Sequence, residues 1–235
     1  RDIERDRKHP RKCKRPLAAG LVKPSVAVVI GIVCLVSSLL LAWYVGRAAL
    51  GIIAIYLVIQ GLYNNWLKNV AVADVFCIGL GFVLRAVLGA AALRVEISGW
   101  LLFCTGALAL MLGFSKRRNE FITMGDGGET RESLSDYTRP ALDALVSIFA
   151  CGAAICYGIY SLESPTARKY PGLILTSLFV FYGIARYVLI VFSKNEGGEP
   201  ETLLYKDPHI LMSVILFILT SILALSGFRI PLVTG

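Results

Sequence analysis

Two aspartates and a run of basic residues near the start of the chain have the types and spacing for phosphate chemistry. Asp2 and Asp6 are four residues apart, so on a helix they share one face, where two carboxylates can hold a hard cation such as Mg²⁺. Basic residues follow at once, namely Lys8, Arg11, Lys12, Lys14 and Arg15. Acids beside dense bases, directly before a long apolar stretch, indicate a magnesium–pyrophosphate site at a membrane surface. The alternative, which the residue types leave equally open, is a basic membrane flank whose acids only moderate its charge.

Residues 115–139 form a second polar segment with candidate binding groups. The cations Lys116 and Arg117 follow an apolar stretch, Glu120 adds a carboxylate and Tyr137 adds a hydroxyl. A loop can be polar simply because it is exposed to solvent, but long loops in compact proteins are more often functional. We therefore expect this segment to contribute to the same site as the first one.

The composition is that of a membrane protein with several spans. Of the 235 residues, 56% are hydrophobic and only 17% are charged, and the mean hydropathy is +0.69, whereas a soluble domain carries roughly 25% charged residues. The apolar runs between the charged clusters are long, as in polytopic membrane proteins. The net charge of +8 then indicates cytosolic loops that face anionic lipid and phosphorylated substrates, not a surface that binds nucleic acid.

Seven apolar stretches are long enough to cross a bilayer as helices, which takes about 20 residues each. They are predicted as helices because a segment in lipid must satisfy its own backbone hydrogen bonds, and none has the alternation of a barrel strand. The chain is therefore predicted to be all-α, a polytopic transmembrane helical bundle that forms one membrane domain over residues 1–235. The predicted spans are residues 25–45, 47–66, 70–93, 97–115, 140–162, 171–193 and 209–228.

The connections between these spans differ in charge. With seven spans, four segments lie on the same side of the membrane and contain most of the Lys and Arg: residues 1–24, 66–69, 115–139 and 193–208. The positive-inside rule places this side in the cytosol. The two candidate segments, residues 1–24 and 115–139, are therefore predicted to be active-site loops that face the cytosol.

Three ionisable residues lie in or near the predicted spans. Asp74 is close to the cytosolic start of the third span, Arg85 lies deeper in it, and Arg186 lies about two turns from the cytosolic end of the sixth. Charges inside a membrane usually face a bundle interior or a cavity, so these residues are functional candidates. The alternatives are snorkelling to the interface for Arg186 and a helix N-terminal acid for Asp74.

The motifs in this sequence resemble those of the UbiA prenyltransferase superfamily. Asp2-x-x-x-Asp6 followed by Lys12-x-x-Arg15-Pro16 is similar to the end of its first aspartate-rich motif. Most members carry a second Asp-x-x-x-Asp, where this chain has Lys116-Arg117-Arg118-x-Glu120. That form resembles the decaprenyl-phosphate phosphoribosyltransferase branch more than aromatic prenyltransferases. The resemblance covers almost the whole chain and also rests on His9-Pro10, Asp74-Val-Phe, Gly81-Phe-Val-Leu-Arg85-Ala, Tyr137-Thr, Arg186-Tyr187, Gly197-Gly198 and the late Glu201 and Asp207.

The resemblance implies a fold and a reaction. Members have nine transmembrane helices around a cavity open to the cytosol, so we expect two helices to precede the seven found here. The implied reaction transfers a phosphoribosyl group from phosphoribosyl pyrophosphate to a polyprenyl (decaprenyl) phosphate, with release of pyrophosphate, in a bacterial inner (plasma) membrane. Mg²⁺ would be held by the catalytic acids Asp2 and Asp6. The implied substrate-binding residues are Lys12, Arg15, Asp74, Lys116, Arg117, Glu120, Tyr137 and Arg186.

Two other functions stay open at this point. A UbiA-type prenyltransferase would move an isoprenoid from its diphosphate to an aromatic acceptor, with the same fold and the same magnesium–pyrophosphate chemistry. A transporter or a scaffold that binds anionic lipid is the third possibility. Transporters often show internal repeats and paired, broken helices, and no such pairing is visible in this sequence. The sequence sets neither the length of the polyprenyl chain nor the oligomeric state.

Overall fold

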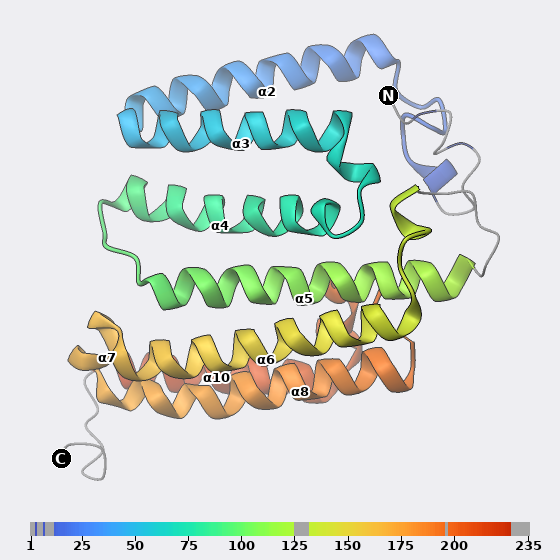
Figure 1. Ribbon diagram of the computed structural model, residues 1–235. Coiled ribbons are helices and arrows are strands. Elements are labelled where there is room, and N and C mark those ends of the chain that lie inside the picture. Colours follow the sequence, from blue (N-terminus) through green and yellow to red (C-terminus); the bar gives the residue numbers. More distant parts are fainter. Residues whose placement is uncertain (1–2, 4–6, 8–11, 125–131, 196, 227–235) are drawn as a thin grey trace.

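The computed structural model describes Ile3, Arg7 and residues 12–124, 132–195 and 197–226, which form a bundle of long helices (Figure 1). These residues contain helices and turns but no strand, which confirms the all-α prediction. Seven helical segments are long and apolar enough to cross a membrane, as the sequence predicts. The long helices are α2 (Pro24–Val45), α3 (Arg47–Asn65), α4 (Ala73–Leu93), α5 (Gly99–Met124), α6 (Arg139–Glu163), α8 (Thr176–Ser193) and α10 (Pro208–Leu225). The short ones are η1 (Lys12–Lys14), η2 (Leu67–Asn69), η4 (Glu132–Leu134), α7 (Pro165–Lys169), η5 (Pro171–Leu175) and α9 (Pro200–Lys206).

Glycine, proline and capping side chains set the helix boundaries. Gly46 joins α2 to α3 with a φ of 139°, a conformation that residues other than glycine rarely adopt. Pro208 begins α10, where its missing N–H costs no hydrogen bond. The Asp207 carboxylate accepts hydrogen bonds from the N–H groups of His209 and Ile210, both at 3.1 Å, and so satisfies two donors at the start of that helix.

The largest difference from the sequence prediction lies at the end of α5. The hydropathy pattern predicts that the fourth span ends at Ser115 and a loop follows, but α5 continues to Met124. Residues 116–124 include Lys, Arg, Glu and Met, which are good helix formers, and ion pairs hold this part of the helix to its neighbours. A hydropathy pattern registers where a helix becomes charged, not where it stops. Lys116, Arg117 and Glu120 therefore lie on a helix and not in a loop.

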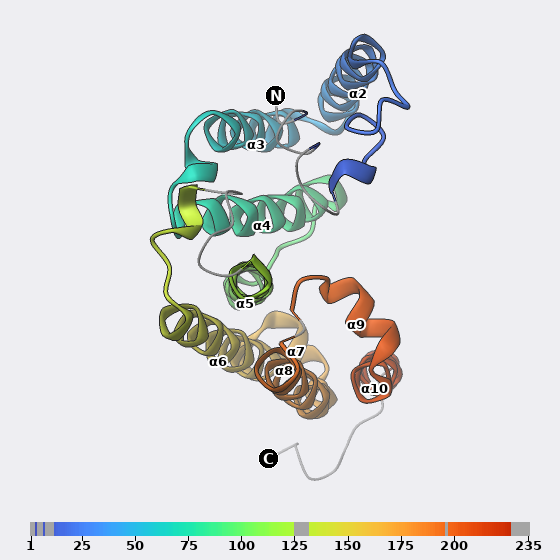
Figure 2. The same cartoon turned by 90° about the vertical axis from the view of Figure 1, so that its right-hand side faces the viewer.

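Helices that are neighbours in the chain are neighbours in space. Viewed along the bundle, α2, α3, α4, α5, α6, α8 and α10 follow one another in an arc (Figure 2). The core lies between α4, α5, α6 and α8, where Phe114, Leu142 and Val146 are fully buried. Gly113 of α5 packs directly on Val75 of α4, and a Cβ at this glycine would lie 2.5 Å from the Val75 Cγ1. Small residues of this kind allow helices in a membrane to approach closely.

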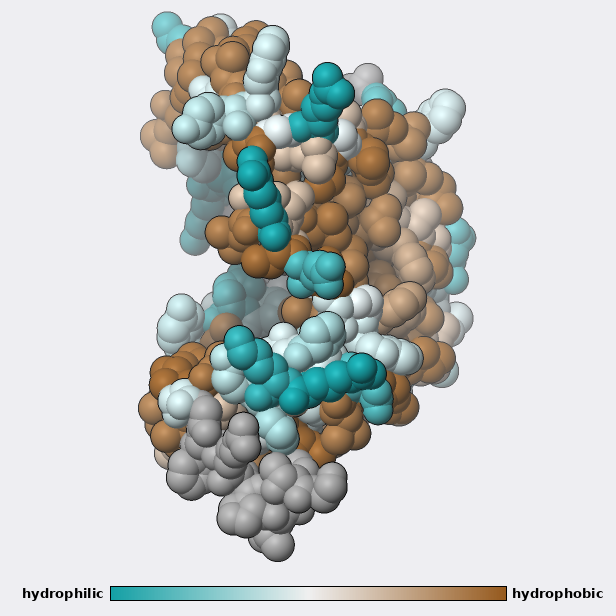
Figure 3. All heavy atoms as spheres, turned by 90° about the vertical axis from the view of Figure 1, so that its left-hand side faces the viewer, coloured by the Kyte–Doolittle hydropathy of each residue, from teal (hydrophilic) through white to brown (hydrophobic). Residues whose placement is uncertain are grey.

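The flanks of the bundle are apolar. On α2, for example, Val28, Val29 and Ile32 are each more than half exposed. Figure 3 looks onto the end that carries α7 and shows hydrophobic atoms along the flanks, hydrophilic side chains at the end, and a hollow on one side of the bundle. A soluble monomer rarely exposes apolar patches of this extent. The chain is therefore a multi-pass membrane protein.

One end of the bundle gathers the polar segments, and we call it the site end. There α3 leads into α4, α5 leads towards α6, and α8 leads through α9 into α10, whereas α7 lies at the opposite end (Figure 1). Three of the segments predicted to share one side of the membrane, residues 66–69, 115–139 and 193–208, have their described parts at this end.

Candidate functional site at one end of the bundle

Asp74 is the centre of a buried polar cluster at the site end. It lies in the first turn of α4 and is fully buried. Its Oδ2 accepts a hydrogen bond from the Arg117 Nε at 2.7 Å, and its Oδ1 accepts one from the Val75 N–H at 2.8 Å. The Tyr137 hydroxyl donates to the same Oδ1 at 3.5 Å. A buried carboxylate needs such partners because an unpaired buried charge is costly. The fold thus brings together Asp74, Arg117 and Tyr137, three residues that the sequence predicts for the site.

Arg117 is held between two carboxylates. Only 3% of its side chain is exposed, and besides Asp74 it pairs through Nη1 with Glu120, one turn further along α5. Its charge is therefore balanced within the protein. The sequence predicts Arg117 and Glu120 as substrate-binding residues, and the structure shows that they bind each other.

A strained turn precedes Asp74. Val72 has a φ of 67° and a ψ of −49°, and the Ala73 N–H donates to the Ala71 carbonyl oxygen at 2.8 Å. These are the features of the rare γ-turn with positive φ, which is unfavourable for a β-branched residue. The N–H of Val72 donates to the Tyr137 hydroxyl oxygen. One hydroxyl therefore supports both the strained turn and the Asp74 carboxylate.

Tyr137 is itself well buried. Its side chain is 5% exposed, and its ring packs edge-on against Phe114 with the ring centroids 6.4 Å apart. Burial raises the pKa of Tyr137 to about 12. The hydroxyl therefore keeps its proton at neutral pH and acts as a hydrogen-bond donor and acceptor, not as a base.

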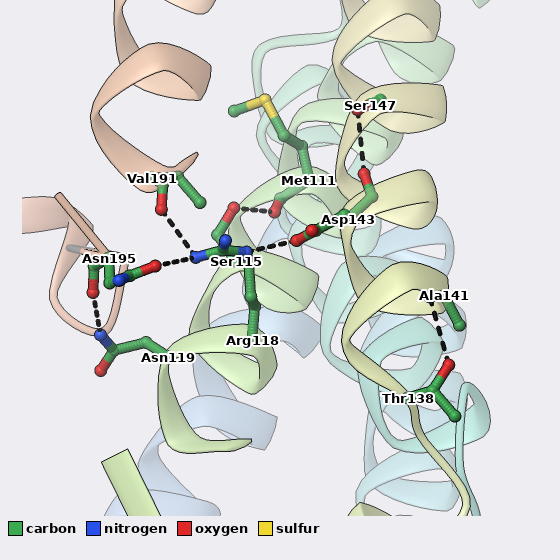
Figure 4. A network of polar contacts seen from close by, with 10 residues as sticks. All are labelled: Met111, Ser115, Arg118, Asn119, Thr138, Ala141, Asp143, Ser147, Val191 and Asn195. Carbon is green, nitrogen blue, oxygen red and sulfur yellow. Dashed lines mark hydrogen bonds and ion pairs between the residues drawn. The ribbon is translucent and has the colours of Figure 1, made fainter. Parts of the chain in front are cut away.

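Arg118, the next residue on α5, ties three helices together (Figure 4). It is 2% exposed, and its Nε donates to the Asp143 carboxylate on α6. Its Nη1 donates to the Val191 carbonyl oxygen on α8 at 2.7 Å and to the Asn195 Oδ1 at 3.0 Å. The Phe192 ring centroid lies 5.1 Å from the guanidinium carbon, a distance at which a cation is attracted to the ring. Arg118 thus joins α5 to α6, to α8 and to the segment after α8.

The segment between α8 and α9 lies directly on α5. The Asn119 Nδ2 donates to the Asn195 carbonyl oxygen at 2.6 Å. A Cβ at Gly197 would lie 3.0 Å from the Ser115 carbonyl oxygen, and one at Gly198 would lie 2.4 Å from the Asn119 Oδ1. Close packing on α5 therefore favours glycine at both positions, in addition to any turn.

Arg186 forms a further ion pair at this end. Its Nη2 lies 2.7 Å from the Asp207 Oδ2, and its Nε lies 3.2 Å from both carboxylate oxygens. Asp207 is 7% exposed and Arg186 is 25% exposed. The guanidinium, together with the two N–H groups at the start of α10, lowers the pKa of Asp207 to about 2. The sequence predicts Arg186 as a substrate-binding residue, and the structure shows it fastening α8 to the start of α10.

Of the other predicted site residues, three lie in the described part of the chain and two do not. Lys116 is exposed on α5 and forms no hydrogen bond or ion pair within the described part of the chain. Lys12 begins η1, and Arg15 is exposed just after it. Asp2 and Asp6 lie outside the described residues. Within those residues, no group of three or more His, Cys, Asp or Glu side chains could hold a metal, and the Mg²⁺ site stays a prediction.

Three partners in these networks are not among the predicted site residues, although Asp207 belongs to the motifs of the resemblance: Asp143, Asn195 and Asp207. A signal existed for Asp143, because an acid inside a predicted span needs a cationic partner. Asp207 could have been recognised as a capping residue, since it directly precedes a proline and an apolar run. Asn195 gave no such signal, because its contact depends on how the segment after α8 folds back onto α5.

The charges of the site end are arranged in two ways. Arg117, Arg118 and Arg186 are each paired with an acid, which makes a rigid polar framework. Lys116 stands exposed beside this framework. Such an arrangement can bind an anion at the membrane surface, for example a phosphate, whose oxygens accept charge-assisted hydrogen bonds from Lys.

Comparison with known proteins gives a consistent result. The profile of the UbiA prenyltransferase family matches residues 1–119. A decaprenyl-phosphate phosphoribosyltransferase of Mycolicibacterium smegmatis is 30% identical over 88% of this chain and 68% of its own length. A protein of that name from Mycobacterium tuberculosis is 30% identical over 94% of this chain and 72% of its own. A protein of that name from Corynebacterium glutamicum is 26% identical over 95% of this chain and 69% of its own length.

Proposed function

The chain belongs to the UbiA prenyltransferase family, and we propose that it transfers a phosphoribosyl group from phosphoribosyl pyrophosphate to a polyprenyl phosphate. An oxygen of the lipid phosphate would form a bond to the anomeric carbon of the ribose. The bond from that carbon to the pyrophosphate oxygen would break, and pyrophosphate would leave. The transition state would resemble an oxocarbenium ion, as in other glycosyl transfers. The lipid phosphate is already an anion, so its attack needs no strong base.

One observation carries this proposal more than any other. Relatives named decaprenyl-phosphate phosphoribosyltransferase match between 88% and 95% of the chain. The geometry of the site end supports it, because both substrates are anionic and Lys116 is exposed beside a rigid polar framework at the end of the bundle.

The framework suggests a division of roles among the predicted residues. Lys12, Arg15 and Lys116 would contact phosphate oxygens through charge-assisted hydrogen bonds. Asp74, Glu120 and Tyr137 would hold Arg117 in place, so that Arg117 would act as a positioning residue that fixes α5 and the adjacent Lys116. Arg186 would act through Asp207 by fixing the start of α10.

Asp2 and Asp6 would hold Mg²⁺, which would neutralise charge on the leaving pyrophosphate. Two carboxylates four residues apart are a suitable donor set for this ion. In the full-length protein, Asp2→Asn or Asp6→Asn should greatly reduce turnover without preventing membrane insertion. Chelation should abolish activity and Mg²⁺ should restore it, whereas full activity in EDTA would contradict the role.

We also propose that the site end faces the cytosol of a bacterial inner membrane. The concentration of Lys and Arg in the connections at this end supports that orientation. In a cysteine-free background, Asp136→Cys at the site end should be labelled only from the cytosolic side, and Lys169→Cys on α7 only from the other. Labelling of both from one side would contradict the orientation.

A second candidate is the transfer of an isoprenoid to an aromatic acceptor, which the match to a prenyltransferase family favours. One assay separates the two. Membranes that contain the full-length protein should move label from phosphoribosyl pyrophosphate into an organic-soluble lipid when polyprenyl phosphate is added. If they instead prenylate 4-hydroxybenzoate and ignore phosphoribosyl pyrophosphate, the second candidate is right.

A further inference from the structure

Arg85 is a cation in the middle of a membrane-spanning helix. It lies twelve residues after the start of α4 and eight before its end. Since a helix rises about 1.5 Å per residue, these intervals are roughly 18 Å and 12 Å. Snorkelling brings charged side chains to the interface when they lie near the end of a helix. Arg85 is more than two turns from either end, so snorkelling does not account for it.

The protein supplies this charge with polar and aromatic partners but with no acid. The Arg85 Nη2 donates a hydrogen bond to the Tyr56 hydroxyl on α3 at 3.0 Å. The guanidinium carbon lies 5.6 Å from the ring centroid of Tyr56 and 5.2 Å from that of Phe82. Among the described residues no carboxylate pairs with Arg85, in contrast to Arg117, Arg118 and Arg186. The remaining donors of the guanidinium form no hydrogen bond within the described part of the chain.

Polar groups lead from the site end towards this arginine. Gln60 lies on α3 between the site end and Tyr56, one helical turn from the tyrosine. Gly81 leaves space beside both, since a Cβ there would lie 3.5 Å from the Tyr56 ring and 3.9 Å from the Gln60 amide nitrogen. Asp74 and Arg85 are eleven residues apart on α4, which is roughly 16 Å along the axis and close to a whole number of turns. They therefore lie on the same side of the helix at two depths.

We propose that Arg85 and Tyr56 form a phosphate-binding site within the membrane span, separate from the cluster around Asp74. A cation left unbalanced at this depth is costly, and an anionic ligand would balance it. The guanidinium fork and the adjacent hydroxyl present several N–H and O–H donors to one point, which suits the oxygens of a phosphate. Two ligands could bring that phosphate: the polyprenyl phosphate, whose tail occupies the membrane, and the sugar donor, whose ribose carries its own phosphate. The identity of these two ligands rests on the proposed function, whereas the phosphate site itself does not.

The test compares variants of the full-length protein in the transfer assay, with the apparent KM measured for each substrate separately. Arg85→Ala should raise one of the two KM values at least about tenfold, which corresponds to roughly 1.4 kcal/mol. A change for polyprenyl phosphate assigns the site to the lipid, and a change for phosphoribosyl pyrophosphate assigns it to the sugar donor. Arg94→Ala is the matched control, because Arg94 is an exposed arginine at the far end of the same helix, and it should leave both values unchanged.

Two conservative variants keep the test informative if Arg85→Ala does not accumulate in membranes. Arg85→Lys keeps the charge but loses the fork, and Tyr56→Phe keeps the ring but loses the hydroxyl. Both should raise the KM of the same substrate by a smaller factor. If all the variants that accumulate keep both KM values within twofold of the wild type, or lower only thermal stability, the site is refuted.

If the proposed function is wrong, the expected result is different. In that case the wild-type protein transfers no phosphoribosyl group, and thermal unfolding with farnesyl phosphate or inorganic phosphate provides the test. Stabilisation of the wild type that is lost in Arg85→Ala, or reduced in Arg85→Lys, supports the phosphate site without the reaction. No stabilisation of the wild type by either probe refutes it.

Discussion

Arg117 and Asp74 form an ion pair from which water is excluded. The Nε and Oδ2 atoms lie 2.7 Å apart, and the two side chains are 3% and 0% exposed. The pair joins the beginning of α4 to the end of α5. Removing one partner of a buried pair costs about 3–5 kcal/mol, because the other charge is left without compensation. The geometry of the site end therefore depends on both residues at once.

Asp74→Asn should lower the free energy of unfolding by about 3 kcal/mol, since Arg117 would keep only the partly exposed Glu120 as a charged partner. Thermal unfolding in detergent measures the loss. Asp136→Asn is the control, because Asp136 is exposed in the segment before α6 and its neutralisation should change stability little. Equal stability of the two variants would contradict a structural role for the Asp74 charge.

Val72→Gly should be neutral or stabilising, although glycine usually weakens a structure. The φ of 67° at Val72 costs a β-branched residue about 1–3 kcal/mol, and glycine would relieve that strain. The control is Val70→Gly, because Val70 has an ordinary φ of −100° and glycine there should cost about 0.5–1 kcal/mol. If both variants lose stability equally, the turn at Val72 is not strained.

Arg118 and Asp143 should be energetically coupled. A double-mutant cycle with Arg118→Met and Asp143→Asn, measured by thermal unfolding, should give an interaction energy of about 1–3 kcal/mol. Asp143 is 37% exposed, so water partly screens the pair, and the single Asp143 change should cost less than the single Arg118 change. Additive effects would show that Arg118 is held mainly by the Val191 carbonyl and Asn195.

Lys116→Ala should raise the apparent KM for phosphoribosyl pyrophosphate about tenfold, the effect of losing roughly 1.4 kcal/mol of charge-assisted hydrogen bonding. Its stability should not change, because Lys116 is exposed and pairs with no other described residue. Lys169→Ala at the opposite end provides a matched exposed lysine. An unchanged KM in Lys116→Ala would remove Lys116 from the substrate site.

The ion pair of Asp207 and Arg186 should make stability depend on pH in an acidic window. The pKa of Asp207 is lowered from its usual 3.8 to about 2 in the folded protein. The contribution of the Asp207 charge to the free energy of unfolding is therefore complete above about pH 4 and is lost as the pH falls towards 2. Thermal unfolding should show a steeper loss of Tm over this window in the wild type than in Asp207→Asn. Identical pH profiles would contradict the pairing.

The sequence was sufficient for the number of spans but not for the pairing of their charges. Hydropathy predicted seven spans because the length and apolarity of a transmembrane helix are properties of the local sequence. The continuation of α5 to Met124 was missed because the ion pairs at Arg117 and Arg118 form with residues far away in the chain. The residues of the Asp74 cluster are candidates that the sequence alone can name, but their mutual contacts depend on how α4, α5 and the segment before α6 pack.

Two adjacent residues also show what the sequence alone does not decide. Lys116 and Arg117 are adjacent and chemically similar, and nothing in the sequence separates them. Successive residues on a helix point about 100° apart, so one is exposed while the other is buried between two acids. Only the packing of α5 decides which of the two can meet a substrate.

The order of the helices in the arc has a consequence for how the protein is made. Each long helix packs on the one that precedes it in the chain, from α2 to α10. A helix that leaves the translocation machinery therefore finds its partner already in the bilayer. Contacts between consecutive elements close quickly because the chain between them is short. Assembly can thus follow synthesis from one helix to the next: the Arg117 ion pair would hold α5 to α4, which is already in place, and the contacts of Arg118 would hold α5 to α6 and α8 as these arrive in turn.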